Sequence, residues 1–145
     1  MKILMLVFSL LFSMNLFAGD SDSHGNIVLT VDGFHNNEGI ARIALFLSSD
    51  GFPGQPAKAI KTLDTEIRDG KLKASFMGIP YGVYAVSVLH DENRNGKMDT
   101  NWVGMPKEGY GASNDAKSSF GPPEFDDARF SLDAKDLQLH ITVQY

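Results

Sequence analysis

The 145-residue sequence contains no cysteine, and this absence excludes several classes of protein at once. The chain cannot be a scaffold held by disulfides, a thiol-dependent enzyme or a lipoprotein anchored through a processed cysteine. An exported domain without disulfides must be stabilised by its apolar core or by a bound metal ion. The hydrophobic pattern and the spacing of possible metal ligands are therefore the features of the sequence that tell most about how the domain is stabilised.

The sequence also lacks an excess of positive charge and lacks common catalytic motifs. Its 13 basic and 18 acidic residues give a net charge of −5, which disfavours binding to nucleic acid or to an anionic membrane surface. No G-x-S-x-G nucleophile turn and no phosphate-binding glycine loop is present. The histidines, none of which has metal-pair spacing, are His24, His35, His90 and His140. We therefore expect a protein that is not an enzyme.

A single long apolar stretch lies at the start of the chain. Lys2 precedes an apolar run over residues 3–17, and Ala18 is a small residue at its end. This is the layout of a secretory signal peptide, whereas a membrane-spanning helix needs about 20 apolar residues. We expect residues 1–18 to be cleaved, residues 19–25 to form a linker and residues 26–145 to form one domain. The protein would then be exported, with no membrane-inserted segment after cleavage.

From residue 26 onward, apolar residues recur at every second position, which is typical of β-strands. We expect strands over residues 27–31, 39–47, 63–67, 72–76, 82–90, 130–132 and 137–145. Asp69-Gly70 is a two-residue turn signal that predicts a hairpin between the third and fourth of these strands. Residues 57–61 favour a helical turn. Many short strands indicate a sandwich or barrel, and we predict a single all-β domain, a seven-stranded antiparallel sandwich with one long irregular loop.

The long irregular loop covers residues 100–127. Its glycines and prolines indicate a shaped loop rather than a disordered one. Loops longer than about 15 residues are uncommon in compact domains and are often functional. Because Trp102 and Tyr110 can stack on a sugar ring or insert against a protein, we expect this loop to bind an unknown protein or carbohydrate partner. The ordinary alternative is a loop that is packed by its own aromatic side chains.

The stretch HDENRNGKMDTNW (residues 90–102) has the ligand spacing of a calcium-binding loop, and Gly96 permits its sharp turn. The expected ligands are Asp91, Asn93, Asn95, the carbonyl of Lys97 and Asp99. A strand precedes this loop, and Trp102 stands where an EF-hand has a glutamate, so the loop is not an EF-hand. The missing ligand would come from Asn101, Glu108, Asp126 or Asp127. We predict one calcium ion bound with a dissociation constant on the order of 0.1–1 mM.

Two alternatives to these interpretations remain open. Asp and Asn side chains in turns bond their own backbone amides, so the same spacing also suits a loop without metal. The acidic residues Glu124, Asp126 and Asp127 could instead serve a cation-dependent carboxylate hydrolase, since paired carboxylates hydrolyse glycosidic bonds. Calcium could also act only as a staple for folding, with the function on the sheet surface.

Four stretches of the chain resemble one protein family. They are ARIALFLSSDGFPGQPAKA (41–59), GIPYGVYAVSVLHDENRNGKMDTN (78–101), GMPKEGYGASN (104–114) and FGPPEFDDARF (120–130). In this order they resemble the exported bacterial family known as domain of unknown function 2141 (DUF2141), over roughly residues 26–145. The resemblance implies an exported β-sandwich in the periplasm, or alternatively in the extracellular space, and it implies no reaction.

The piece GIPYGVYAVSV is also similar, more loosely, to the strand entry of transthyretin-like and collagen-adhesin B-type sandwiches, which are immunoglobulin-like in architecture. Some relatives of those domains are calcium-stabilised surface modules, which favours the metal prediction. Others are hydrolases, but this chain ends in TVQY and lacks the Tyr-Arg-Gly-Ser-like tail of the urate-pathway form.

Overall fold

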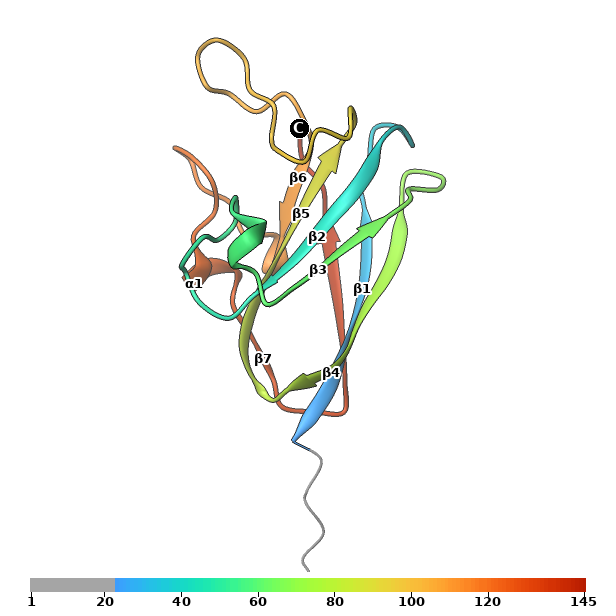
Figure 1. The fold of residues 1–145 in the computed structure, drawn as a ribbon, viewed down its shortest axis with the longest axis vertical. Coiled ribbons are helices and arrows are strands. Elements are labelled where there is room, and N and C mark those ends of the chain that lie inside the picture. The colour runs from blue at the N-terminus through green and yellow to red at the C-terminus, as the bar shows by residue number, and fades with distance from the viewer. Residues whose placement is uncertain (1–22) are drawn as a thin grey trace, which may run out of the picture.

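The computed structural model describes residues 23–145, so the predicted signal peptide and most of the predicted linker lie outside the described residues. Within that range the chain forms eight strands, two 3₁₀ turns and one short helix (Figure 1). They are β1 (His24–Asp32), β2 (Ile40–Phe46), η1 (Pro56–Lys58), β3 (Lys61–Thr65), β4 (Leu72–Pro80), β5 (Gly82–Asp91), β6 (Tyr110–Ala112), η2 (Ser113–Asp115), α1 (Phe125–Ala128), β7 (Phe130–Leu132) and β8 (Asp136–Thr142). None of the described helices is long and apolar enough to cross a membrane.

The strands form two sheets that share one apolar core. One sheet has the order β4-β1-β8, and the other has the order β3-β2-β5-β6 with β7 also paired to β5. In β1 the residues Ile27, Leu29 and Val31 are fully buried and alternate with half-buried residues, as expected for a strand with one covered face. The core cluster draws on both sheets. The all-β prediction is therefore confirmed.

The prediction of seven antiparallel strands is wrong in number and in direction. The described residues form an eighth strand, β6, and β1 runs parallel to β8 from the Asn26–Asp136 pair to the Asp32–Thr142 pair. The strand β6 has no readable alternation in the sequence because it contains Gly111 and Ala112, which carry little or no side chain. A Cβ atom on Gly111 would lie 2.8 Å from Ile141, so the site requires glycine.

The predicted two-residue turn at Asp69-Gly70 is present, with Arg68 and Lys71 bonded across it, but the predicted pairing of the strands on either side of it is wrong. Strand β3 pairs with β2, whereas β4 pairs with β1, so this turn carries the chain from one sheet to the other. The local pairing is limited to a bridge between Arg68 and Lys71. Ile67 and Leu72, on either side of the turn, are both buried in the shared core. The two strands separate because each covers a different side of the core.

The segment of residues 100–127 is not one irregular loop. It contains β6, the turn η2 and the helix α1, and β6 pairs with β5 and touches Gln144 near the C-terminus. These elements divide it into two exposed pieces, residues 99–107 and residues 117–123. The first piece projects beyond the strand ends at the end of the molecule where the C-terminus lies (Figure 1).

Candidate binding finger and its support

The acidic loop, which we define as residues 91–98, begins at a buried carboxylate at the end of β5. Asp91 is fully buried and pairs with Ile40 of the neighbouring strand β2. Its Oδ2 atom accepts hydrogen bonds from Nε of Arg42 at 2.6 Å and from the amide of Gly96 at 2.8 Å. Its Oδ1 atom accepts a hydrogen bond from the amide of Asn95 at 3.0 Å. One side chain therefore fixes the turn of the loop against β2.

The charge of Asp91 is balanced by Arg42. Burial alone raises the pKa of Asp91, but the hydrogen bonds from Arg42 and from the two loop amides outweigh it, so its pKa lies below the ordinary value. The hydrogen bond to Asp91 raises the pKa of Arg42 in turn. Arg42 also donates to Asp64 at 2.9 Å. The pair is therefore ionised at neutral pH and joins three segments of the chain.

A second buried carboxylate closes the loop at its far end. Glu108 is 5% exposed, and its Oε1 atom accepts a hydrogen bond from the amide of Glu92 at 3.0 Å. Its Oε2 atom accepts one from the amide of Asp99 at 3.0 Å. The two ends of the acidic loop are thus held by the two oxygens of one side chain. An amide that loses such a buried partner costs about 1–3 kcal/mol, so this bridge resists opening.

The residue before the loop is a buried histidine. His90 is fully buried, and its Nε2 atom lies 2.8 Å from the carbonyl oxygen of Glu38. Because a carbonyl only accepts, Nε2 carries the proton, and in the neutral imidazole Nδ1 accepts from the hydroxyl of Tyr145. Tyr145 stacks on His35 with ring centroids 3.6 Å apart. His90 therefore anchors the C-terminus beside the loop rather than offering a catalytic base.

The finger, which we define as residues 99–107, is a short hairpin with a capped turn. Thr100 and Pro106 form a bridge, and the amide of Lys107 donates to the carbonyl of Asp99 at 2.8 Å. The side-chain oxygen of Asn101 accepts hydrogen bonds of 3.0 Å from the amides of Val103 and Met105. Local bonds of this kind hold a turn without any contact to the rest of the protein.

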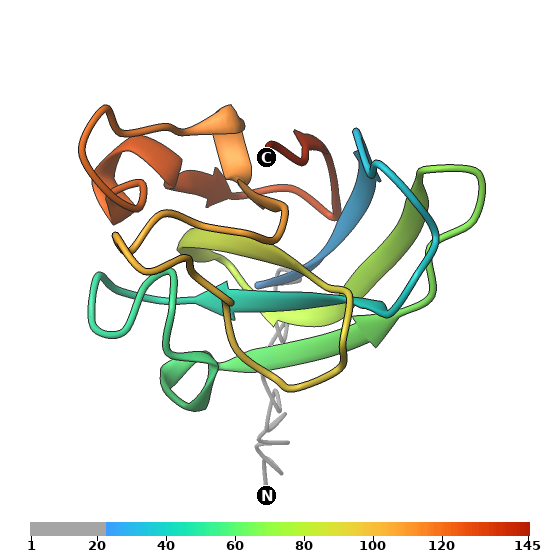
Figure 2. The ribbon, with the colours of Figure 1, turned by 90° about the horizontal axis from the view of Figure 1, so that it is seen from above.

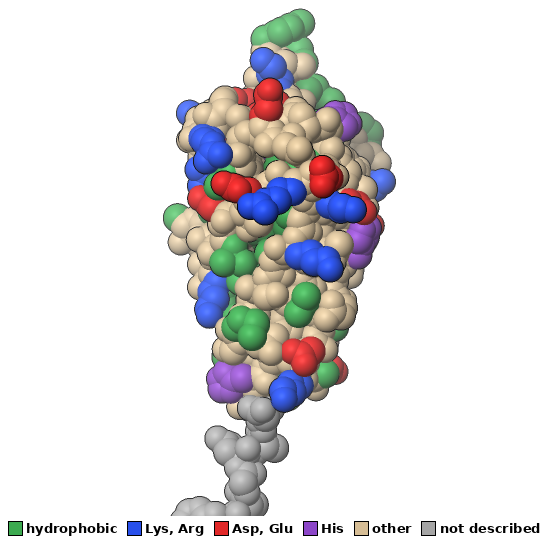
Figure 3. All heavy atoms as spheres, turned by 90° about the vertical axis from the view of Figure 1, so that its right-hand side faces the viewer, with side chains coloured by type: hydrophobic (Ala, Val, Ile, Leu, Met, Phe, Trp, Pro, Cys, Tyr) green, Lys and Arg blue, Asp and Glu red, His purple; other side chains and the backbone are tan. Residues whose placement is uncertain are grey.

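The tip of the finger is apolar and faces solvent. Trp102 is 95% exposed, and its neighbours Val103 and Met105 are 57% and 60% exposed. Figure 3 shows apolar side chains at the uppermost tip of the molecule, and Figure 2 looks down on residues 91–107 where they cross above β2. Large apolar side chains that gather on one exposed element mark an interaction site more often than scattered ones.

The residues predicted to bind calcium lie within one loop. The carboxylate of Asp99 accepts hydrogen bonds from the side-chain amides of Asn93 and Asn95, the latter at 2.8 Å. The amide of Lys97 donates to the side chain of Asn95 at 3.0 Å. A calcium ion bound here would compete with Arg42 for the oxygen of Asp91.

Between residues 23 and 145, no three His, Cys, Asp or Glu side chains gather closely enough to hold a metal ion. The predicted calcium ligands also include side-chain amide oxygens and a backbone carbonyl oxygen, so the calcium site stays a prediction.

The two aromatic residues predicted to bind a partner lie in different settings. Trp102 is at the tip of the finger, whereas Tyr110 is half-buried in β6. The backbone of Tyr110 exchanges hydrogen bonds of 2.9 and 2.8 Å with Gln144, and it is in register with Leu89 of β5. Tyr110 is therefore fixed in the sheet, and only Trp102 offers its whole side chain to a partner.

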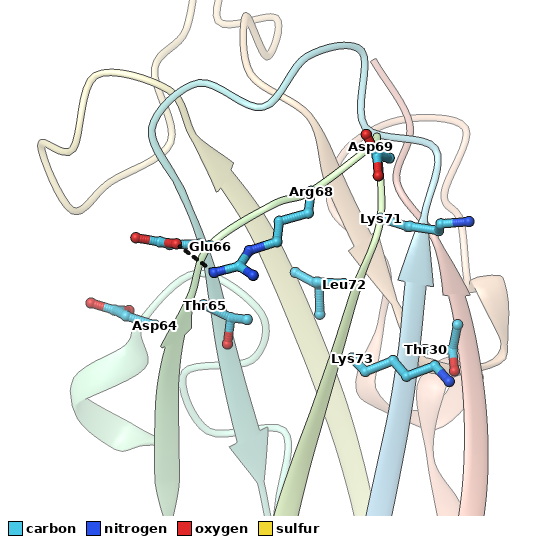
Figure 4. Close-up of a pocket in the computed structure, with 9 residues that line it drawn as sticks. All are labelled: Thr30, Asp64, Thr65, Glu66, Arg68, Asp69, Lys71, Leu72 and Lys73. Carbon is cyan, nitrogen blue, oxygen red and sulfur yellow. Dashed lines mark hydrogen bonds and ion pairs between the residues drawn. The ribbon is translucent and has the colours of Figure 1, made fainter.

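The acidic residues of the hydrolase hypothesis lie at a separate place. Glu124 and Asp126 line an open hollow of about 720 Å³ beside α1, and Asp126 lies 3.6 Å from Arg129. A further hollow, of about 600 Å³, lies between the edges of β3 and β4 (Figure 4). Its acidic and basic side chains are interspersed, as in the ion pair of Glu66 and Arg68, so it favours no sign of ligand charge.

Two residues that matter most at this end were not assigned their roles from the sequence. Arg42 is a lone cation within the apolar strand β2, and an isolated charge of that kind is the signal that it needs a buried partner. Glu108 was considered only as a metal ligand, whereas it bonds backbone amides.

A comparison with protein-family models matches residues 29–140 to a family described as "Uncharacterized protein conserved in bacteria (DUF2141)". No curated protein and no solved structure matches the chain.

Proposed function

We propose that this chain, which belongs to the bacterial family DUF2141, is an exported, non-catalytic module that binds a protein partner through the finger. One observation carries the proposal: Trp102 is 95% exposed on a turn that is fixed by hydrogen bonds. Aromatic side chains of this kind dominate the energy of protein interfaces.

The surroundings of Trp102 favour a protein partner over a carbohydrate. Val103 and Met105 extend the apolar surface of the tip, which suits insertion into an apolar pocket. A sugar platform combines an aromatic face with polar groups that bond the hydroxyls, and Tyr110, the second aromatic of the original prediction, is held in the sheet. Carbohydrate binding is therefore the second outcome to test.

The support of the finger adds to its suitability for binding. A binding element that is already ordered in the free protein loses less conformational entropy when the partner binds. Asp91 and Glu108 fix the acidic loop from below, and Asn101 fixes the turn itself. The geometry of the tip would then depend on these three side chains rather than on the partner.

Site-specific crosslinking in the native host tests the proposal. A photoreactive amino acid at Val103 should form discrete adducts, and the adducts should disappear when Trp102→Ala is added. The matched control is the same amino acid at Met77, which is 60% exposed on β4, an edge strand of the three-stranded sheet. Identical adducts from both positions would contradict the proposal. Emission from Trp102, the single tryptophan, reports sugar binding when soluble cell-wall oligosaccharides are titrated.

Export is part of the proposal and has its own measurement. Mass spectrometry of the protein purified from a host that exports it should give a chain that starts at Gly19. A chain that retains residues 1–18 would contradict cleavage. Cell fractionation then separates the periplasm from the extracellular medium. The finer assignment of the two-sheet fold to the transthyretin-like type also stays a proposal, and an experimental structure would test it.

We propose further that the acidic loop takes one calcium ion, which would stabilise the finger. The support is the convergence of Asn93, Asn95 and Asp99 on one another. With a dissociation constant near 1 mM, 10 mM calcium should stabilise the protein by about 1.4 kcal/mol relative to chelator. Magnesium is the control ion, and Asp99→Asn should remove the effect. Identical melting in calcium, magnesium and chelator would contradict the site.

The hydrolase alternative keeps one supporting observation, which is that Glu124 and Asp126 line an open hollow. Chromogenic glycosides and esters, assayed with calcium or magnesium, should then be cleaved by the wild type and not by Glu124→Gln or Asp126→Asn. Equal background rates for all three proteins would exclude this alternative for those substrates.

A further inference from the structure

The hollow beside α1 has an aromatic wall. Phe52 packs edge-on against Phe46 and Phe125, with ring centroids 5.4 and 5.8 Å apart, so this part of the wall is fixed. Leu47 and Phe120 also line it and are 57% and 99% exposed. The hollow is open to solvent, and its volume of about 720 Å³ leaves room for a bulky group. The hollow can therefore receive a large apolar side chain.

The rim of the hollow carries negative charge. Glu124 and Asp126 line it and are both exposed; Asp126 lies 3.6 Å from Arg129, so among the described residues Glu124 carries the charge that no ion pair balances. The finger has the opposite character at its base, where Lys107 is exposed directly after the apolar tip. Figure 3 shows a basic side chain just below the apolar tip of the molecule. The tip and the hollow are thus both apolar, and the exposed charged residues beside them, Lys107 and Glu124, are opposite in sign.

We propose that Trp102 of one copy of the chain inserts into the hollow of a second copy, with Lys107 facing the acidic rim. The proposal rests on the proposed function, since it assigns the partner of the finger. Among the described residues, no hydrogen bond or ion pair joins residues 99–107 to the lining of the hollow in the same molecule. Because the two surfaces differ, a pair of copies keeps one free finger and one free hollow, and the association is head to tail.

A second copy is favoured over an unlike protein because one chain carries both complementary surfaces. A single fingertip in an open hollow buries a small area, and small interfaces are weak. We therefore expect self-association with a dissociation constant on the order of 100 µM.

Fluorescence and sedimentation of the full chain, expressed with its leader in place and purified from the exporting host, test the contact. Emission from Trp102 should shift to shorter wavelength, and the average mass should rise, as the protein concentration increases through the dissociation constant. Met105→Ala should weaken association several-fold, whereas Met77→Ala, at an equally exposed position, should leave it unchanged. A constant mass and an unshifted emission at several times that concentration would overturn the proposal.

A mixing experiment tests the head-to-tail geometry. Trp102→Ala keeps the hollow, and the double variant Leu47→Glu, Phe120→Glu keeps the finger. Each should be monomeric alone, with association at least roughly 30-fold weaker than in the wild type. Their mixture should form a one-to-one complex that does not grow, because only one productive contact remains. A mixture that stays monomeric, or a double variant that still self-associates, would overturn the proposal.

The self-association proposal can fail while the proposed function of the finger holds. If Trp102→Ala removes the crosslinks to another protein while the wild type stays monomeric, the finger binds an unlike partner and the self-association proposal is wrong. If the only adducts at Val103 are to this chain itself, the partner is a second copy.

Discussion

The finger and the segment 117–123 each present an almost fully exposed aromatic side chain, yet the chain supports them differently. Trp102 is 95% exposed and Phe120 is 99% exposed. The finger is closed by the bridge of Thr100 and Pro106 and by the bonds to Asn101. In the described part of the chain, segment 117–123 makes one hydrogen bond, from the amide of Phe120 to Ser118 Oγ at 3.3 Å.

This difference shows that exposure alone does not identify a binding element. An aromatic residue on a loosely held segment can adapt to a ligand, but it loses more entropy when it is ordered. An aromatic residue on a fixed turn is ready to bind. Glu108 accepts a hydrogen bond from the amide of Asp99, the first residue of the finger, and Asp91 fixes the acidic loop that precedes it. The finger is thus suited to insert into a partner, and the segment 117–123 is suited to receive an inserted side chain.

The largest expected effect comes from removing the carboxylate beneath the acidic loop. Asp91→Ala leaves Arg42 without its buried partner and leaves the amides of Asn95 and Gly96 unpaired. Each amide that loses its buried acceptor costs about 1–3 kcal/mol, so the loss should total about 3 kcal/mol and lower the melting temperature by roughly 10 °C in a domain of this size. Thermal melting measures the change.

The control for this substitution is Asp133→Ala, at an exposed position between β7 and β8, which should change stability by less than about 0.5 kcal/mol. Equal effects of the two substitutions would show that the acidic loop is not held by Asp91. The contrast between the finger and the segment 117–123 would then lose its physical basis.

Glu108→Gln should have a smaller and more local effect. One of the two backbone amides that Glu108 binds would face the NH₂ group of glutamine instead of an oxygen, at a cost of about 1–2 kcal/mol. Hydrogen exchange should become faster for the amides of residues 92–107 and stay unchanged for residues 117–123. The exposed Glu66→Gln is the matched control. Faster exchange in both pieces would mean that they unfold together and that the support is shared.

The pH dependence of stability should separate the ion pair from the rest of the support. The pKa of Asp91 in the folded protein is lowered below its ordinary value of 3.8. Its contribution is therefore fully present above that value and is lost as the pH falls through the lower, folded pKa. Urea unfolding should show a constant stability difference between the wild type and Asp91→Asn above about pH 5, and a shrinking difference below pH 3.8. A difference that does not change with pH would contradict an ionised Asp91.

Much of the fold follows from the sequence because the strands have a clear period of two. The positions that alternate in residues 27–31 are the buried positions of β1. The sequence does not determine which strands become neighbours, as the pairing of β3 with β2 and the parallel pairing of β1 with β8 show. Both pairings depend on covering the shared core from two sides, which no local pattern encodes.

The position of the candidate site in the chain could be read from the sequence, but the contacts that support it could not. The spacing of Asp91, Asn93, Asn95 and Asp99 lies in a loop whose side chains are hydrogen-bonded within it, and the calcium ion expected there stays a prediction. The same spacing suits a metal and a set of Asx turns, so it could not reveal the bonds from Asp91 to Arg42, 49 positions away, or from Glu108 to the loop amides. Contacts over such separations depend on the register between strands, and that register follows from the whole core.

The smallest expected effect is the change in the stability of the protein when either exposed aromatic residue is replaced. Trp102→Ala and Phe120→Ala remove side chains that already lie in water, so each should change the free energy of unfolding by less than about 0.5 kcal/mol. Chemical denaturation measures this. The two variants should then differ in the hydrogen exchange of their loop amides. In Trp102→Ala the amides of the finger should stay protected, because the hydrogen bonds to Asn101 keep the finger closed after the indole is lost. A destabilisation above about 1 kcal/mol for Trp102→Ala would mean that the indole packs on the protein, and the finger would then be a structural cap rather than a binding element.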